Sequence, residues 1–190
     1  VIDQNVATAE RTGGIVEPLP KLQWFIDVNK PIAARGNKTL KELMRAPVAD
    51  KQINIIPEFY DKTYFHWIDN LRDWCISRQI WYGHRIPVWY RGEEIYSGIE
   101  APEGEGWAQD EDTLDTWFSS ALWTFSTLGW PAQTEDLKIY HPTSVLETGP
   151  DILFFWVARM ILMTQYCLDT VPFHTVYLHG LVRDPKGQKM

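Results

Sequence analysis

The sequence has few cysteines, an excess of acidic over basic residues and no long apolar run. Its two cysteines, Cys75 and Cys167, form no CxxC pair, so we expect neither bound zinc nor a disulfide framework. Lys and Arg number 18 against 25 Asp and Glu, which gives a net charge of −7. Such a chain is a poor independent binder of nucleic acid, because affinity for phosphates comes mainly from Lys and Arg.

Several common signatures are also absent. The sequence contains no GxGxxG, GxxxxGK[ST], GxSxG or HExxH string, which argues against dehydrogenase, P-loop, hydrolase and zincin chemistry. No segment reaches the roughly 18 apolar residues of a membrane span, and the first ten residues do not resemble a secretory leader. We therefore expect a cytoplasmic α/β protein that does not contact a membrane.

The second half of the chain has a clear order of elements. Residues 144–146 are expected to form a strand, Gly149 and Pro150 a turn, 152–167 an almost wholly apolar helix, and 175–178 a second strand. Strand, helix and strand in this order are typical of a βαβ unit. Residues 111–190 are thus predicted to form part of a parallel sheet.

The first 110 residues predict shorter elements. We expect strands at 15–20, 24–26, 53–57 and 86–90, and helices at 39–46, from Pro57 to about Leu71, and from Asp73 to Gln79. Residues 98–110 are rich in Gly, Glu and Pro, so they are the best candidate for a boundary or a surface loop.

The end of the 144–146 strand carries the first candidate site. In open α/β sheets ligands bind beyond the carboxyl ends of strands, where Asp151 of the Gly149 turn can accept a ribose hydroxyl or an ammonium group. The alternative is a helix N-cap. Trp117, Ile152 and Trp156 can wall an apolar pocket, although core packing is the more common fate of such residues.

Three further features have two interpretations each. His179 and Gly180 can contact a phosphate or a base, or be structural. Asp112 and Asp115 suggest acid–base work or Mg²⁺, but an acidic solvated loop is favoured. Basic and aromatic residues interleave over 74–89, which suits either a clamp on a single-stranded RNA end or a core helix with extended arginines.

Six strings in a fixed order are more specific than any single feature. They are NLRDWCISRQ at 70–79, GHRIP at 83–87, DEDTLDTWFSSALW at 110–123, GPDILFFWVARM at 149–160, HG at 179–180 and QKM at 188–190. Together they resemble the class I aminoacyl-tRNA synthetases over nearly the whole chain. Within that family, DTWFSS and DILFFW resemble the valyl version.

The resemblance implies a Rossmann-like catalytic domain split by insertions, of which this chain carries the second half as a partial parallel sheet. Residues 1–25 resemble the segment returning from an editing domain, 26–110 a mixed α+β connective insertion, and 111–190 the second half of the catalytic domain. The chain lacks a HIGH-type element and the editing domain. It stops inside a KMSKS-type loop, of which Lys189 and Met190 match the first two letters.

The resemblance also implies roles for individual residues. The residues of the amino-acid pocket are Trp117, Ile152 and Trp156. The residues that contact ATP or the adenylate are Gly149, Asp151, His179, Gly180, Lys189 and Met190, of which Lys189 is the catalytic one. The implied substrates are valine, ATP with its Mg²⁺, and tRNA(Val), all used by the full-length protein, and no metal is implied on the protein itself.

Three functions remain as alternatives. The first is part of a valine-tRNA ligase. This part is expected to be inactive by itself, because half of the ATP site is missing. The second is the corresponding part of an isoleucyl- or leucyl-type enzyme. The third is a non-catalytic module that binds an RNA end through 74–89.

Overall fold

The computed structural model describes residues 5–10 and 12–190, so residues 1–4 and 11 of the predicted return segment lie outside the described residues. The strands are β1 Phe25–Ile26, β2 Asn54–Ile56, β3 Trp74–Cys75, β4 Ser77–Arg78, β5 Val88–Arg91, β6 Glu94–Ser97, β7 Ala108–Gln109, β8 Thr113–Leu114, β9 Thr143–Thr148 and β10 Phe173–Leu178. The helices are α1 Leu40–Ala49, α2 Tyr60–Asp69, α3 Thr116–Ser120, α4 Trp123–Ser126, α5 Glu135–Tyr140 and α6 Ala158–Leu168. Short 3₁₀ turns lie at η1 Ala33–Arg35 and η2 Pro150–Ile152, and a π turn, η3 Leu153–Val157, leads into α6.

A three-stranded parallel sheet with the order β2-β10-β9 organises the main body. The central strand β10 places Val176 between Leu146 of β9 and Ile55 of β2. The chain runs from β9 through α6 to β10, which confirms the predicted βαβ unit and the partial Rossmann-like sheet. Because β2 belongs to the same sheet, the region predicted as a connective insertion supplies one of its strands.

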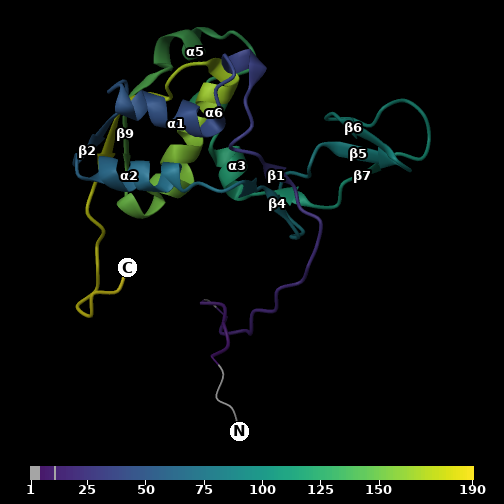
Figure 1. The fold of residues 1–190 in the computed structure, drawn as a ribbon, viewed down its shortest axis with the longest axis horizontal. Coiled ribbons are helices and arrows are strands. Elements are labelled where there is room, and N and C mark those ends of the chain that lie inside the picture. The colour runs from purple at the N-terminus through teal and green to yellow at the C-terminus, as the bar shows by residue number, and fades with distance from the viewer. Residues whose placement is uncertain (1–4, 11) are drawn as a thin grey trace.

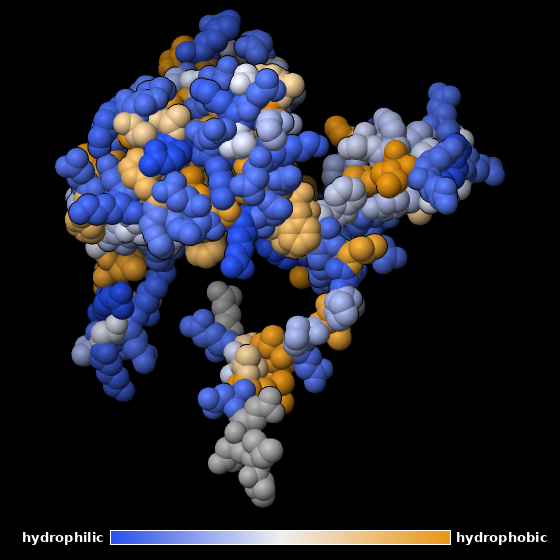
Figure 2. Space-filling model, in the orientation of Figure 1, coloured by the Kyte–Doolittle hydropathy of each residue, from blue (hydrophilic) through white to orange (hydrophobic). Residues whose placement is uncertain are grey.

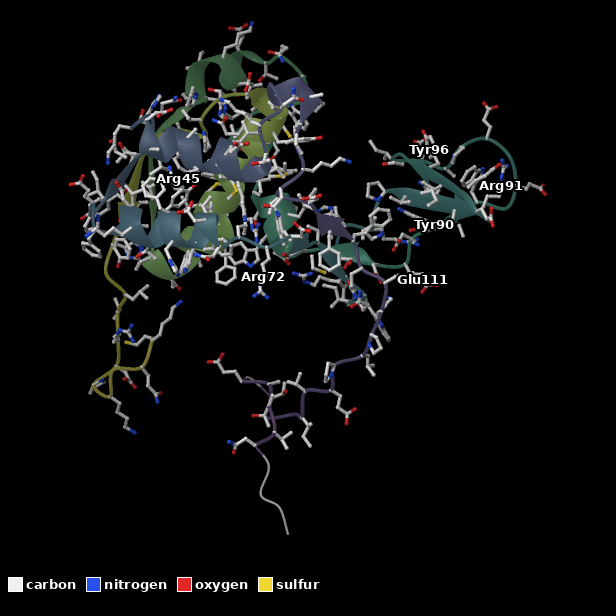
Figure 3. The ribbon with its side chains drawn as sticks, in the orientation of Figure 1. Arg45, Arg72, Tyr90, Arg91, Tyr96 and Glu111 are labelled. Carbon is white, nitrogen blue, oxygen red and sulfur yellow. The ribbon has the colours of Figure 1, made fainter. Side chains whose placement is uncertain are left out.

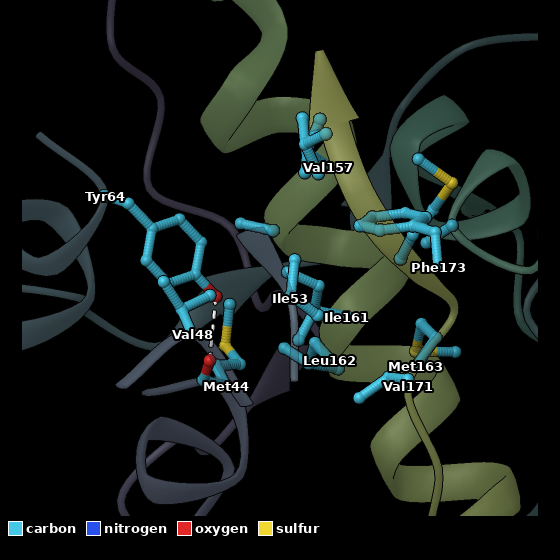
Figure 4. Packing of buried hydrophobic residues seen from close by; sticks show 14 of the residues in the cluster. Met44, Val48, Ile53, Tyr64, Val157, Ile161, Leu162, Met163, Val171 and Phe173 are labelled. Carbon is cyan, nitrogen blue, oxygen red and sulfur yellow. Dashed lines mark hydrogen bonds between the residues drawn. The ribbon is translucent and has the colours of Figure 1, made fainter. Parts of the chain in front are cut away.

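The core lies between this sheet and the helices α1, α2 and α6 (Figures 1 and 4). Phe173, Val176 and Ile161 are fully buried. The Tyr64 hydroxyl is also buried and donates a hydrogen bond of 2.8 Å to the carbonyl of Met44, which ties α2 to α1. Burial raises the pKa of Tyr64, so this hydroxyl keeps its proton.

Local signals set the start of each of the two first helices. Thr39 and Glu42 form a reciprocal capping box at the start of α1. The second helix begins at Tyr60 rather than at Pro57. The intervening residues form a turn in which the Tyr60 N–H donates to the Pro57 carbonyl at 3.1 Å.

Two predicted elements are wrong. Residues 73–79 form the strands β3 and β4, not a helix, because β3 pairs with β1 and β4 with β8. Asp73 accepts a hydrogen bond from the Val28 N–H instead of capping a helix. At 15–20 the described residues contain one isolated bridge, between Ile15 and Thr8, since the prolines that follow cannot donate to a ladder.

A three-stranded antiparallel arm with the order β6-β5-β7 projects from one side of the body (Figure 1). Residues 98–107 form its largely exposed outer loop, as the composition of 98–110 predicts. Its exposed apolar residues include Ile95 and Ile99, and Figure 2 shows an apolar patch on the arm beside a mainly hydrophilic body. Asp110 links the arm to the N-terminal segment by accepting hydrogen bonds from Tyr90 and from the Trp24 indole.

The helical segment Pro150–Leu168 is long and apolar enough, by length and composition, to cross a membrane. Half of its most apolar window is buried inside the protein. Packing of α6 against α1 and β10 accounts for this composition, because a core helix is apolar on most of its surface.

Candidate functional site

The carboxyl ends of β9 and β10 meet at one edge of the parallel sheet. Leu178 lies beside Thr148 in register. One residue further on, the His179 N–H donates a hydrogen bond of 3.1 Å to the Thr148 carbonyl. This extension of the ladder brings Gly149 and His179 to the same edge, although 30 residues separate them in the sequence.

Gly149 leaves space for two neighbouring side chains at this edge. A Cβ atom there would lie 2.5 Å from Oδ1 of Asp151 and 2.9 Å from a methyl carbon of Leu181. Real Cβ atoms do not approach other atoms this closely. Any larger residue at this position would therefore make the side chains of Asp151 and Leu181 move.

Asp151 projects from η2 toward the C-terminal loop. Its carboxylate accepts a hydrogen bond and forms an ion pair with Lys189. The hydrogen bond from Lys189 holds the pKa of Asp151 below its usual range. Among the described residues η2 has no side-chain cap, so Asp151 does not act as the N-cap that was the alternative. Its carboxylate instead connects two parts of the edge.

The loop at 181–190 folds back on itself. The Asp184 carboxylate accepts hydrogen bonds from the N–H groups of Lys186 and Gln188, and Arg183 pairs with Lys189 in an isolated bridge. This fold points Lys189 back toward Asp151. Most residues of the loop, Met190 among them, are exposed.

The three residues of the predicted amino-acid pocket pack against different neighbours. Trp117 stacks on Phe155 with ring centroids 6.0 Å apart. Trp156 instead lies against Trp123, and its indole donates to the Ser120 carbonyl at 3.2 Å. Ile152 is half-buried in η2, beside the sheet edge.

Trp117 lines a cavity of about 600 Å³ between η3, α3 and the β3–β4 segment. Its polar lining residues are Arg72, Asp73, Arg78, Asp115 and Arg159. Ile152 and Trp156 are not among the described residues that line it. Arg159 was not predicted as a site residue, although an arginine in an otherwise apolar helix is a signal that the sequence contains.

Asp112 and Asp115 are not part of a solvated acidic loop. Asp112 is buried and pairs with Lys21 at 2.7 Å, and it accepts a hydrogen bond from Gln79. Asp115 is buried and pairs with Arg78 at 2.9 Å. Both carboxylates are held by residues distant in sequence, which the spacing of two aspartates cannot reveal.

The basic and aromatic residues of 74–89 do not share a helix face either. Trp74 is buried against Asp115, to which its indole donates at 3.1 Å. Arg85 donates to the carbonyls of Gln109 and Asp110. Trp81 is 95% exposed. The interpretation of this stretch as a core helix is therefore wrong.

In the described part of the chain, no group of three or more His, Cys, Asp and Glu side chains is arranged to hold a metal ion. The polar groups at this edge of the sheet are the backbone of Gly149, the His179 imidazole, the Asp151 carboxylate and the Lys189 ammonium group.

One protein-family model matches this chain along most of its length. Residues 6–104 and 93–190 match the model for class I tRNA synthetases (I, L, M and V). These matches extend over most of the chain, which therefore belongs to the class I tRNA synthetase family.

Within the family, the similar curated proteins are valine–tRNA ligases. The chain is 52% identical to that of Oceanobacillus iheyensis and 51% identical to that of Bacillus subtilis, over 98% of its own length in each case. It spans 21% of the length of each of these relatives.

Solved structures share the fold at low identity. A methionyl-tRNA synthetase of Mycobacterium tuberculosis bound by methionyl-adenylate aligns with 97% of this chain and 31% of its own, at a TM-score of 0.60 and 18% identity. An Agrobacterium radiobacter LeuRS in a ternary complex with tRNA aligns with 63% of this chain and 21% of its own, at a TM-score of 0.53 and 22% identity. Both likenesses concern the fold alone.

Proposed function

We propose that this chain is part of an enzyme that activates valine with ATP and transfers the valyl group to tRNA(Val). The observation that carries the proposal is the identity of about half of all residues with valine–tRNA ligases along 98% of the chain. The reaction is attack of the valine carboxylate on the α-phosphate of ATP, which forms valyl-adenylate and releases pyrophosphate. A hydroxyl at the 3′ end of the tRNA then attacks the valyl carbonyl, which forms the ester and releases AMP. By the same inference the enzyme acts in the cytoplasm.

The sheet edge supports a role in adenylate binding. Gly149 leaves bare backbone beside the ligand, and Asp151 can accept hydrogen bonds from ribose hydroxyls once Lys189 leaves it. His179 and Gly180 extend the edge on the neighbouring strand. A released Lys189 then contributes positive charge to the phosphates, where charge stabilisation and positioning do most of the catalytic work. Mg²⁺ enters as the counter-ion of ATP.

The amino-acid pocket belongs to the same proposal. Trp117, Ile152 and Trp156 are proposed to surround the valine side chain, although the structure holds Trp117 and Trp156 against different aromatic neighbours. Residues 1–25, 26–110 and 111–190 are proposed as the return segment, connective insertion and second catalytic half of the complete enzyme.

Calorimetric titration with a non-hydrolysable valyl-adenylate analogue tests the proposal, with isoleucyl and leucyl analogues alongside. An apolar pocket discriminates one methylene by roughly 10–200-fold, so the valyl analogue should bind more tightly by about that factor. Trp156→Ala should abolish the preference. The matched control is Trp107→Ala, which removes an indole from the outer loop of the arm.

Equal affinity for the three analogues would rule out valine selection by this pocket. Preference for the isoleucyl or leucyl analogue would assign the chain to that type of enzyme instead. Loss of preference in both tryptophan variants would show a general effect of losing an indole and would remove the role of Trp156.

A further inference from the structure

Trp117 and Trp156 have different aromatic neighbours, but both are attached to the short helix α3. Trp117 lies in the first turn of this helix. The Trp156 indole donates a hydrogen bond of 3.2 Å to the carbonyl of Ser120, the last residue of the same helix. At a rise of about 1.5 Å per residue, the two points of attachment lie about 4.5 Å apart along the helix axis. The position of α3 therefore affects both rings at once.

Asp115 holds the start of α3. A helix of five residues is too short to be stable by itself, because nucleation costs more than so few hydrogen bonds return. Asp115 is its N-cap: the carboxylate accepts a hydrogen bond of 3.4 Å from the Trp117 N–H. The backbone carbonyl of Asp115 accepts a second one, of 2.8 Å, from the Phe118 N–H. The first turn of α3, with Trp117 in it, is thus fixed relative to Asp115.

Asp115 is in turn fixed to the β3–β4 segment. Its carboxylate forms an ion pair of 2.9 Å with Arg78 and accepts a hydrogen bond of 3.1 Å from the Trp74 indole. Its backbone N–H donates to the Ile76 carbonyl at 2.7 Å. The Arg78 guanidinium also donates to one carbonyl of β3 and one of β4. The pair of Asp115 and Arg78 therefore links α3 to two strands that lie far from it in the sequence.

The carboxylate of this pair is withdrawn from water. Asp115 is 7% exposed, whereas the side chain of Arg78 is 39% exposed. Desolvation offsets much of the attraction in a buried ion pair, so such a pair adds little stability compared with apolar residues of similar volume. Its charge-assisted hydrogen bond is nevertheless directional, and it fixes the orientation of the two elements that carry it. Orientation of α3 is thus the main contribution of the pair.

We propose that Asp115 and Arg78 are positioning residues for amino-acid selection: they fix α3, and α3 fixes the rings of Trp117 and Trp156. The inference rests on the proposed function, because it treats both rings as walls of the valine pocket. A site discriminates well only if its side chains are held to within about 0.5 Å. Rings on a loosely held helix would shift and admit one more methylene group, so selection depends on how firmly α3 is held.

NMR of the ligand-free chain with ¹⁵N-labelled tryptophan tests the attachment of the Trp156 ring to α3. Asp115→Asn keeps the shape of the side chain but removes its charge. Among the described residues Trp156 forms no hydrogen bond with Asp115, so its indole responds through α3. Its signal should shift, and its N–H should exchange with solvent about 10-fold faster. The matched control is Asp112→Asn, which breaks another buried pair outside α3 and should leave this signal unchanged.

Calorimetric titration of the same variants with the valyl- and isoleucyl-adenylate analogues tests the effect on selection. Asp115→Asn should lower the ratio of the two affinities about 10-fold, because looser rings accept the extra methylene group. A residue needed only for stability would weaken both analogues by the same factor and leave this ratio unchanged. Asp112→Asn should also leave it unchanged.

Variants of Arg78 test the same pair from its other side. Arg78→Gln should lower the affinity ratio as Asp115→Asn does, and Arg78→Lys, which keeps the charge, should restore part of it. The matched control is Arg45→Gln, which breaks the exposed pair of Arg45 with Asp69 between α1 and α2 (Figure 3) and should leave the ratio unchanged.

Two results would overturn the inference: an unchanged Trp156 signal in Asp115→Asn, or an equal change of that signal in Asp112→Asn. A changed signal with an unchanged affinity ratio would overturn the role in selection. A chain without valyl preference would contradict the proposed function, and with it that role, while the Trp156 signal would still report whether α3 holds the ring. If Asp115→Asn does not fold, the less buried Arg78→Gln variant decides.

Discussion

The βαβ core and the projecting arm are held together in opposite ways. In the core, β9, α6 and β10 follow one another within 36 residues and bury apolar side chains such as Phe173 and Val176. In the arm, short strands with many exposed residues are fastened by Asp110, which joins Tyr90 and the Trp24 indole across 86 positions. Apolar burial is non-directional and tolerates small shifts, whereas the polar fastening depends on a few oriented groups.

This difference predicts where the molecule opens first. Regions with few buried apolar contacts and exposed backbone hydrogen bonds open at low free-energy cost, while the core opens only on global unfolding. The arm and its junction should therefore move independently of the parallel sheet.

The largest effect should come from the core. Phe173→Ala removes a fully buried ring from β10 and should lower the free energy of unfolding by about 3–5 kcal/mol. Ile95→Ala, at an exposed position of the arm, should change it by less than about 0.5 kcal/mol. Chemical denaturation of both variants measures the contrast. A similar loss of unfolding free energy in the two variants would contradict the contrast between a packed core and a weakly packed arm.

The junction between the two regions should show an intermediate effect. Asp115→Asn keeps the shape of the side chain but removes the charge that Arg78 pairs with, at a cost of about 1–3 kcal/mol. Amide hydrogen exchange should become faster at 74–78 and 113–115 and stay unchanged in β9 and β10. The matched control is Glu135→Gln, which breaks an exposed pair on α5. Faster exchange in β10 would show that the junction supports the core.

The smallest effect should be a pH dependence of the arm. Partial burial raises the pKa of Asp110, but hydrogen bonds from Trp24, the Asp112 N–H and Tyr90 outweigh it, so the pKa falls below 3.8. A carboxylate with a lowered pKa stabilises the fold above its unfolded pKa, and this stability is lost as the pH falls through the folded value.

The contribution of Asp110 is on the order of 1 kcal/mol, since the group is only partly buried. As the pH is lowered below about 4, the NMR signal of the Trp24 indole should therefore shift. The signals of core residues should change only at a lower pH. Asp110→Asn should remove this transition. A transition that persists in the variant would have to come from another group.

The accuracy of prediction from sequence follows the same division. Continuous apolar runs and β-branched residues were sufficient to predict β9, α6 and β10, because these three elements follow one another in the sequence. Trp74 and Arg78 were wrongly predicted on one helix, because local spacing cannot report that Trp74 pairs with Ile26 and Arg78 with Thr113.

The site shows the same limit. The turn at Gly149 and the strand before His179 are local features, and their meeting at one edge follows from a parallel sheet. The pairing of Asp151 with Lys189 spans 38 residues and could not be inferred from spacing. Burial of Asp112 and Asp115 was missed for the same reason, since Lys21 and Arg78 lie on other segments.

The ion pair between Asp151 and Lys189 is formed for only part of the time. Both side chains are partly exposed, at 30% and 57%, and an exposed pair of this kind is worth about 0.2–1 kcal/mol. The pair is then broken for about a sixth to two fifths of the time, and a ligand that needs both groups free loses only about 2–6-fold in apparent affinity. The loop would therefore compete only weakly with a ligand of the proposed adenylate site, and no separate opening signal would be needed.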